Sequence, residues 1–199
     1  MSSNNLLILV ATMTGTALMA AEDIAEYCEN NEINTKVHEM DNLDISEIIN
    51  ANCPILICSS TYGQGDVPDG SQDFYDELKK TAPNLSNIKY SIFGLGDMTY
   101  RDTFAYGGKK FFDLLNSLGA NSLAKPFYHD ASDGTLPEEV AVDWFIFKNL
   151  LKLGYKAIFT NEIITYYRQH YKNTLGLKEE GGEFLFWWEK KIKQGLLSG

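Results

Sequence analysis

The chain has 199 residues, of which 44% are hydrophobic and 22% are charged. This size and balance fit one globular domain, with or without an appendage, and argue against disorder or a fibrous repeat. The formal net charge is −10, which argues against nucleic acid as the main partner.

The sequence offers no signal for a membrane or an oxidising compartment. The longest uncharged apolar run spans residues 6–12, far short of the ~18 residues that a transmembrane helix needs. The N-terminus lacks the charged and apolar regions of a secretory leader. Cys28, Cys53 and Cys58 are odd in number and lack metal-type spacing, so they are interpreted as buried, reduced thiols. We therefore expect a cytoplasmic protein without a membrane partner or a metal site.

Strand and helix patterns alternate along the first 150 residues. Strands are predicted at residues 6–10, 33–40, 54–59 and 90–94, with a weaker one at 120–128. Helices are predicted at residues 17–31, 45–51, 72–81, 106–118 and 138–153, the last two ended by Gly119 and Gly154. This alternation predicts an α/β fold, a doubly wound five-stranded parallel sheet with helices on both faces. Ligands of such sheets bind beyond the carboxyl ends of the strands.

The loop after the first predicted strand is small and rich in hydroxyl groups. It reads TMTGTA from Thr12 and runs directly into a helix. Free N–H groups, the positive end of the helix dipole and three hydroxyls suit a phosphate group. The loop has neither the lysine of GxxxxGK[ST] nor GxGxxG spacing, which excludes a nucleoside triphosphatase and weakens an NAD site. It predicts a phosphate monoester that is bound and left unreacted, with a ligand-free threonine-rich helix cap as the alternative.

The loops after the third and fourth predicted strands combine glycines with an aromatic residue. The first of them reads SSTYGQGDVPD from Ser59, and the second reads FGLGDMTYRDTF from Phe93. Glycines permit a close approach of the backbone to a flat ring, and Tyr62 and Tyr100 can each stack on a ring face. Together with the first loop, they predict a slot for a planar ring beside a phosphate site.

The motifs TxTGTA, SSTYGQGDxPD and FGLGDxxY, followed by HDASDG at residues 129–134, have the order and spacing of flavodoxins. Residues of about 5–150 resemble a short-chain flavodoxin or the FMN domain of a diflavin reductase. The resemblance implies FMN as the cofactor. The residues implied to hold its ribityl phosphate are Thr12, Met13, Thr14, Gly15, Thr16 and Ala17. Those implied to border its isoalloxazine ring are Ser60, Thr61, Tyr62, Gly63 and Gly65 on one side and Leu95, Gly96, Asp97, Tyr100 and Phe104 on the other.

The resemblance also gives Asp97 and Gly63 particular roles. Asp97 stands where diflavin reductases often have asparagine, which would add a negative charge near the ring. Stacked aromatic rings and a surplus of carboxylates disfavour full reduction of the flavin, so the reduced protein is expected to be a strong one-electron donor. The peptide of Gly63 would turn so that its carbonyl accepts a hydrogen bond from the flavin N5–H after one electron has been added. A residue with a Cβ would make this turn more costly.

No side chain is expected to act as a catalytic acid, base or nucleophile. His38 lies in the middle of a predicted strand and His129 lies near the last loop, without a partner at triad-like spacing. His129 is interpreted as an ordinary surface imidazole, with a place near the flavin as the alternative.

Residues 151–199 are interpreted as a C-terminal extension of unknown role that follows an FMN-binding domain of residues 1–150. The extension carries a net charge of +3, against −13 for the preceding residues. A helix is predicted at residues 183–197, with Phe184, Trp187, Trp188 and Ile192 on one face. Asp143-Trp144 with YRQH from Tyr167 resembles the C-terminal end of inverting, A-type-fold glycosyltransferases. Their metal-binding DxD half is not present, so this resemblance implies no sugar transfer by the chain alone.

These patterns favour an FMN protein that carries single electrons from an NAD(P)H-dependent flavin reductase to an acceptor enzyme of unknown identity. Two alternatives stay open. One is a two-electron, FMN-dependent NAD(P)H:quinone or disulfide reductase, against which no second glycine-rich nicotinamide site is visible. The other is a flavin-free binding module on the same fold, against which Tyr62 and Tyr100 argue.

Overall fold

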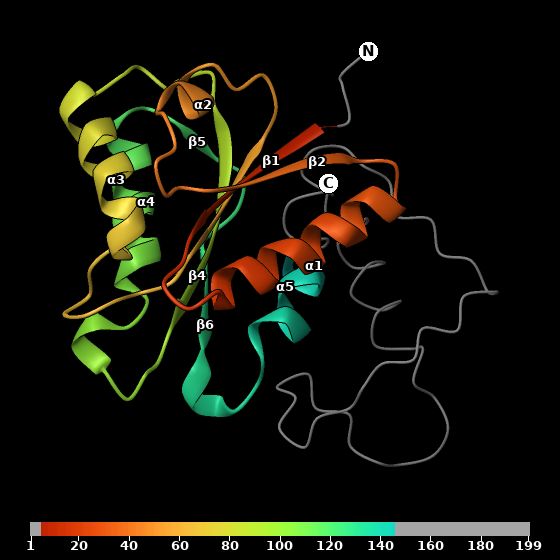
Figure 1. The fold of residues 1–199 in the computed structure, drawn as a ribbon, viewed down its shortest axis with the longest axis vertical. Coiled ribbons are helices and arrows are strands. Elements are labelled where there is room, and N and C mark those ends of the chain that lie inside the picture. Colours follow the sequence, from red (N-terminus) through yellow and green to blue (C-terminus); the bar gives the residue numbers. More distant parts are fainter. Residues whose placement is uncertain (1–4, 146–199) are drawn as a thin grey trace, which may run out of the picture. The chain divides into compact units, whose positions relative to one another are not determined.

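The computed structural model describes residues 5–145, apart from the side chains of Asp143 and Trp144 (Figure 1). Its centre is a parallel sheet with the strand order β2-β1-β3-β4-β5, and β6 also pairs with β4. The chain therefore winds outward in one direction from β1 to β2 and in the other from β3 onward. This confirms the predicted doubly wound α/β fold.

Helices cover both faces of the sheet. The strands are β1 (Asn5–Ala11), β2 (Asn34–Glu39), β3 (Ile55–Ser59), β4 (Lys89–Gly96), β5 (Asn121–Ser122) and β6 (Phe127–Asp130). The α-helices are α1 (Thr16–Asn30), α2 (Ser46–Ile49), α3 (Asp69–Thr81), α4 (Tyr106–Ser117) and α5 (Pro137–Phe145). In Figure 1, α1 and α5 lie on one face, and α3 and α4 lie on the other. None of the described helices is long and apolar enough to cross a membrane.

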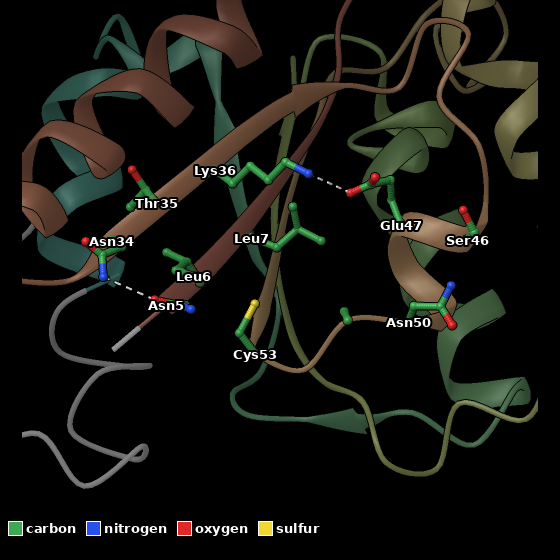
Figure 2. Close-up of a pocket in the computed structure, with 11 residues that line it drawn as sticks. Asn5, Leu6, Leu7, Asn34, Thr35, Lys36, Ser46, Glu47, Asn50 and Cys53 are labelled. Carbon is green, nitrogen blue, oxygen red and sulfur yellow. Dashed lines mark hydrogen bonds and ion pairs between the residues drawn. The ribbon is translucent and has the colours of Figure 1, made fainter. Parts of the chain in front are cut away.

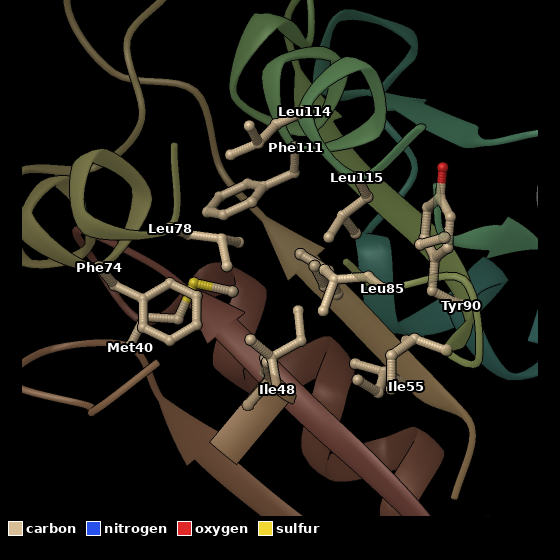
Figure 3. Close-up of a cluster of buried hydrophobic side chains, with 14 of the residues drawn as sticks. Met40, Ile48, Ile55, Phe74, Leu78, Leu85, Tyr90, Phe111, Leu114 and Leu115 are labelled. Atoms are coloured by element: carbon tan, nitrogen blue, oxygen red, sulfur yellow. The ribbon is translucent and has the colours of Figure 1, made fainter. Parts of the chain in front are cut away.

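Each face of the sheet has its own apolar core. Leu7 and Leu9 of β1 belong to the cluster beneath α3 and α4, part of which Figure 3 shows. Ile8 and Val10 of the same strand belong to the cluster beneath α1 and α5. Successive side chains of a strand point to opposite faces, so a strand with a core on each side is apolar throughout. This explains why the central strands are continuous apolar runs in the sequence.

The predicted fifth strand, residues 120–128, is two short strands. β5 pairs with the start of β4, and β6 pairs with its end. Between them, the Ser122 hydroxyl donates to the Ala124 carbonyl at 2.6 Å, and Pro126 has no N–H to donate to a neighbouring strand. The chain therefore leaves the sheet and returns, and within residues 5–145 the sheet has six strands rather than the predicted five.

Helix boundaries agree with the predictions at some ends and differ at others. Gly119 has φ +84, and the next N–H, from Ala120, donates to Leu115 at 3.0 Å, which confirms the predicted end of α4. α3 begins at Asp69, three residues before the predicted start, because the Pro68 carbonyl already accepts a bond from Ser71. The predicted helix end at Gly154 and the whole C-terminal extension lie outside the described residues.

The three cysteines are free, and two of them are buried as predicted. Burial raises the pKa of Cys28 to about 12, and it also raises the pKa of Cys58. Cys53 is only half-buried, so the expectation of burial is wrong for this residue. It lies in the short connection that leads into β3, at the edge of the core.

His129 is buried inside β6, with 2% of its surface exposed. Its interpretation as a surface imidazole is therefore wrong. Its Nε2 lies 3.1 Å from both the carbonyl and the hydroxyl oxygen of Thr135, while Nδ1 has no hydrogen-bond partner among the described residues. Burial lowers the pKa of His129, and the nearby Asp133 opposes this only in part.

We expect Gly107→Ala to destabilise the protein and Gly70→Ala to leave it stable. Both are the second residue of a helix. A Cβ at Gly107 would clash with the carbonyl oxygen of Ser60, whereas one at Gly70 would lie 3.5 Å from Asp41. Overpacking costs about 1–3 kcal/mol, and alanine is favoured over glycine within a helix by about 0.5–1 kcal/mol. Urea unfolding followed by circular dichroism measures both variants, and equal stabilities would contradict this packing.

We also expect His129 to make the protein less stable in mild acid. In the unfolded chain its pKa is about 6.5, and in the folded protein it is lower. The unfolded state therefore binds more protons below about pH 6.5, so stability falls as the pH is lowered through this range. The urea midpoint should fall from pH 7 to pH 6 and again to pH 5, and it should change less in His129→Gln. An identical pH profile in the variant would exclude His129 as the cause.

Candidate functional site

Three loops leave the sheet side by side, at the carboxyl ends of β1, β3 and β4. The strands are in register there, because Ala11 pairs with Ser59 and Ser59 pairs with Gly94. The Ser60 N–H donates to the Ala11 carbonyl at 2.8 Å, so the first two loops begin in direct contact. The structure thus brings together the three loops that the sequence singles out, at the edge where doubly wound sheets bind ligands.

The first loop presents a helix N-terminus with unpaired donors. Gly15, at the N-cap of α1, has φ +86, a left-handed conformation that suits glycine. Its N–H donates to the Thr12 hydroxyl at 3.0 Å, and the Thr14 and Thr16 hydroxyls lie 3.3 Å apart. The first bond within the helix runs from the Met19 N–H to the Gly15 carbonyl. The three helical N–H groups before Met19 therefore have no partner in the helix, which makes this end a suitable anion site.

This anion site has no cation of its own. Residues 12–17 contain neither lysine nor arginine, so any attraction for a phosphate comes from N–H groups, hydroxyls and the helix dipole. The side chain of Met13 is exposed and that of Ala17 is fully buried. Neither side chain carries a hydrogen-bond donor, so these two residues can donate to a phosphate only through their backbone N–H groups.

The loop after β3 is a tight turn closed by its own backbone. The Tyr62 N–H donates to the Asp66 carbonyl at 2.9 Å, and the Asp66 N–H donates back at 2.7 Å. Gly63 and Gly65 have φ +54 and +96. A Cβ at Gly65 would lie 3.1 Å from Tyr106 Cβ, whereas one at Gly63 would meet nothing closer than an Asp66 oxygen at 3.8 Å. Close packing therefore leaves little room for a side chain at position 65. At position 63 there is room, and only the backbone conformation favours glycine.

Two hydroxyls lie at the base of this turn. The Thr61 hydroxyl donates to the Leu95 carbonyl at 2.9 Å and accepts from the Gly107 N–H at 3.1 Å, so it joins the turn to β4 and α4. The Ser60 hydroxyl oxygen is buried and has no hydrogen-bond partner among the described residues. A buried polar group without a partner is costly. Ser60 is therefore suited to a polar ligand group at this loop.

The loop after β4 folds back on itself around Asp97. The Asp97 carboxylate accepts hydrogen bonds from the backbone and hydroxyl of Thr99, and its carbonyl accepts one from Tyr100 at 3.1 Å. The hydrogen bonds of the Asp97 carboxylate are thus made within its own turn. The Tyr100 side chain is 69% exposed and that of Tyr62 is 43% exposed. Large aromatic side chains left open at the site are available to stack on a planar ligand.

The remaining predicted residues of this loop contribute mainly through the backbone and packing. Leu95 is buried at the end of β4. At Gly96, a Cβ would clash with the backbone nitrogen of Ala105 and would lie 3.0 Å from a ring carbon of Phe104. Phe104 itself is half-buried. The far end of the loop is therefore pressed against the end of β4.

Asp130 lies outside the predicted site residues, yet it anchors the loop after β4. Its Oδ1 accepts hydrogen bonds from the Met98 N–H at 2.8 Å and from the N–H and hydroxyl of Ser132 at 3.0 and 2.8 Å. Burial raises the pKa of the Asp130 carboxyl, but these hydrogen bonds outweigh it and hold the pKa below its usual value. The HDASDG motif at residues 129–134 contains Asp130, but the sequence does not show that it lies opposite Gly96, at the carboxyl end of β6.

A groove of about 510 Å³ lies at the opposite end of the sheet, and Figure 2 shows the residues that line it. The amino-terminal residues of β1 and β2 line it together with α2, and Lys36 and Glu47 form an ion pair there at 3.0 Å. None of the three loops contributes to it. Since ligands of doubly wound sheets bind at the carboxyl ends of the strands, the three loops remain the candidate site.

Known proteins resemble this chain over the same region. The flavodoxin family model matches residues 8–144. NADPH-dependent diflavin oxidoreductase 1 of Danio rerio is 32% identical over 149 residues, which are 73% of this chain and 25% of the relative. NADPH–cytochrome P450 reductase of Homo sapiens is 33% identical over 143 residues, or 69% of this chain and 21% of the relative. This chain thus spans a quarter or less of the length of these relatives.

Solved structures agree in fold. A cysteine-to-alanine mutant of flavodoxin from Pseudomonas aeruginosa has a TM-score of 0.63 and 27% identity, and the match covers 71% of this chain and 94% of the mutant. Oxidised flavodoxin 1 from Bacillus cereus, at 23% identity and a TM-score of 0.61, shares the fold over 70% of this chain and 93% of its own. The match to the family model, the shared fold and the three loops together support FMN as the cofactor. The chain belongs to the flavodoxin family.

Proposed function

We propose that this protein binds FMN at the three loops and transfers single electrons between a reductase and an acceptor enzyme. The observation that carries the proposal is the pairing, at one edge of the sheet, of a cation-free anion site with two exposed tyrosines. A phosphate monoester attached to a planar ring matches both features. The buried hydroxyl of Ser60, which has no hydrogen-bond partner among the described residues, is a further candidate to contact a polar group of the ligand.

The proposed contacts with FMN come from residues of the three loops. The phosphate would be held by the backbone and hydroxyl groups of Thr12, Met13, Thr14, Gly15, Thr16 and Ala17. The ring would lie between Ser60, Thr61, Tyr62, Gly63 and Gly65 on one side and Leu95, Gly96, Asp97, Tyr100 and Phe104 on the other. Leu95 and Gly96 would act through their backbone, because the first is buried and the second has no side chain.

FMN would supply the redox chemistry, since a flavin takes up and releases electrons singly. The protein's part is to bind, orient and shield it. The hydrogen bonds that close the loop after β3 use backbone groups of Tyr62, Gly65 and Asp66, and the Gly63 carbonyl accepts none from the described residues. That carbonyl is therefore available to accept a hydrogen bond from a protonated ring nitrogen.

The partners would be redox proteins. NADPH appears in the names of several relatives, but this chain matches a quarter or less of their length. The donor that we propose is an NAD(P)H-dependent flavin reductase, in keeping with the NADPH in those names. The net charge of −13 on residues 1–150 would steer partners with a basic surface toward the protein.

The first test is to incubate the purified protein with FMN, desalt it and record its absorbance spectrum during stepwise photoreduction. We expect retained FMN, reduced in two resolved one-electron steps. Riboflavin should bind at least ~10-fold more weakly, because it lacks the phosphate that the first loop holds. A protein that retains no flavin would refute the proposal. One that reduces in a single two-electron step and oxidises NADPH unaided would establish the two-electron reductase instead.

The second test is Gly63→Ala, with Gly119→Ala as a matched control. Both glycines have positive φ, and a Cβ would lie 3.8 or 3.9 Å from its nearest atom. Both variants should therefore lose some stability through backbone strain. Only Gly63→Ala should bring the two reduction steps closer together, because a side chain there hinders the turning of its peptide. Photoreduction of both proteins measures this separation, and an unchanged separation in Gly63→Ala would refute the role of Gly63.

A further inference from the structure

Lys109, in the first turns of α4, lies in a cage of three aromatic rings. Its Nζ is 5.3, 5.0 and 5.5 Å from the ring centroids of Phe104, Tyr106 and Tyr128, within the range of cation–π attraction. The same ammonium donates a hydrogen bond of 2.6 Å to the Phe104 carbonyl. Among the described carboxylates, none lies within ion-pair distance of Lys109. Its positive charge therefore interacts with the faces of these three rings and with the Phe104 carbonyl oxygen.

This cage adjoins a strained residue. Ala105, the N-cap of α4, is fully buried and has φ +54 and ψ +27, a left-handed conformation that is costly for a residue with a Cβ. Such strain persists only where the surroundings enforce it. Lys109 holds the chain on both sides of the strained residue. Its N–H donates to the Ala105 carbonyl at 3.0 Å, and its ammonium donates to the Phe104 carbonyl.

Phe104 and Ala105 end the loop after β4, which forms one wall of the proposed flavin site. Phe104 and Ala105 press on Gly96, where a Cβ would clash with the Ala105 backbone. One short turn back along the loop, the Tyr100 carbonyl accepts a hydrogen bond from Thr103 at 3.0 Å. The position of Tyr100 therefore depends on the conformation of the chain at Phe104 and Ala105.

We propose that Lys109 is a positioning residue of the flavin site. By holding the strained turn at Ala105, it fixes the wall that Tyr100 and Phe104 present to the ring. This inference rests on the proposed FMN binding. The neighbouring Lys110 has a different contact, an ion pair of 2.7 Å with Asp66 in the loop after β3.

The test compares Lys109→Met, Lys109→Arg and Lys36→Met with the unmodified protein. Methionine keeps an apolar stem in the cage but removes the charge and the donor, whereas arginine keeps both. Lys36→Met makes the same change of charge at the groove of Figure 2, three strands away from β4. The FMN dissociation constant is measured by fluorescence quenching. Hydrogen exchange of the amides of residues 97–105 is measured in the flavin-free protein.

Lys109→Met should bind FMN about 10-fold more weakly, the loss typical of one hydrogen bond to a charged group. It should also exchange the amides of residues 97–105 faster. Lys109→Arg should restore binding to within ~3-fold of the unmodified protein, and Lys36→Met should match the unmodified protein in both measurements. Equal behaviour of Lys109→Met and Lys36→Met would overturn the inference.

The two measurements also distinguish failure of this inference from failure of the proposed FMN binding. If the unmodified protein binds no FMN, the proposed function is refuted, while the exchange measurement still decides whether Lys109 holds the loop. If Lys109→Met does not fold, Lys109→Leu replaces it, since leucine also lacks both the charge and the donor. Unchanged FMN affinity and unchanged exchange in Lys109→Leu would overturn the inference as well.

Discussion

The close approach of α4 to the carboxyl ends of β3 and β4 is the constraint on which the candidate site depends. It is possible because Gly94 faces Gly108, with a Cβ at position 108 only 2.9 Å from the Gly94 Cα, and because Gly107 has no side chain to meet the Ser60 carbonyl. At this separation the Gly107 N–H reaches the Thr61 hydroxyl. The helix thereby fixes the loop after β3 directly, and the loop after β4 through the turn at its own N-terminus.

The site is built from backbone groups and hydroxyls rather than from charged side chains. The end suited to an anion is a helix N-terminus with three threonines and no cation. The Asp97 carboxylate accepts its hydrogen bonds from Thr99, within its own turn. Under the proposed function, such a site would attract a dianion without a strong positive field that would also favour electron uptake. Binding strength and reduction potential would then be set by different groups, the first loop for one and the loops after β3 and β4 for the other.

The sequence predicts those parts of the fold that depend on local patterns. The apolar run of β1, the helix end at Gly119 and the three glycine-rich loops each depend on residues close together in the chain. The break at Pro126 is a local feature too, because proline has no N–H to donate within a sheet. The burial of His129 and the anchoring role of Asp130 depend instead on the pairing of β6 with β4, which no local pattern reveals. The contacts of Lys109 are hidden in the sequence for the same reason, because its cage includes Tyr128 from β6.

The loop after β3 makes its closing hydrogen bonds between Tyr62 and Asp66, within a few residues of one another. The peptide at its tip can change orientation without displacing a strand or a helix, so few atoms move and little ordered structure is broken. Under the proposed function this keeps the nuclear reorganisation that accompanies each electron small. The rate of electron delivery would then depend on how often and how well a partner docks, rather than on any rearrangement of the protein itself.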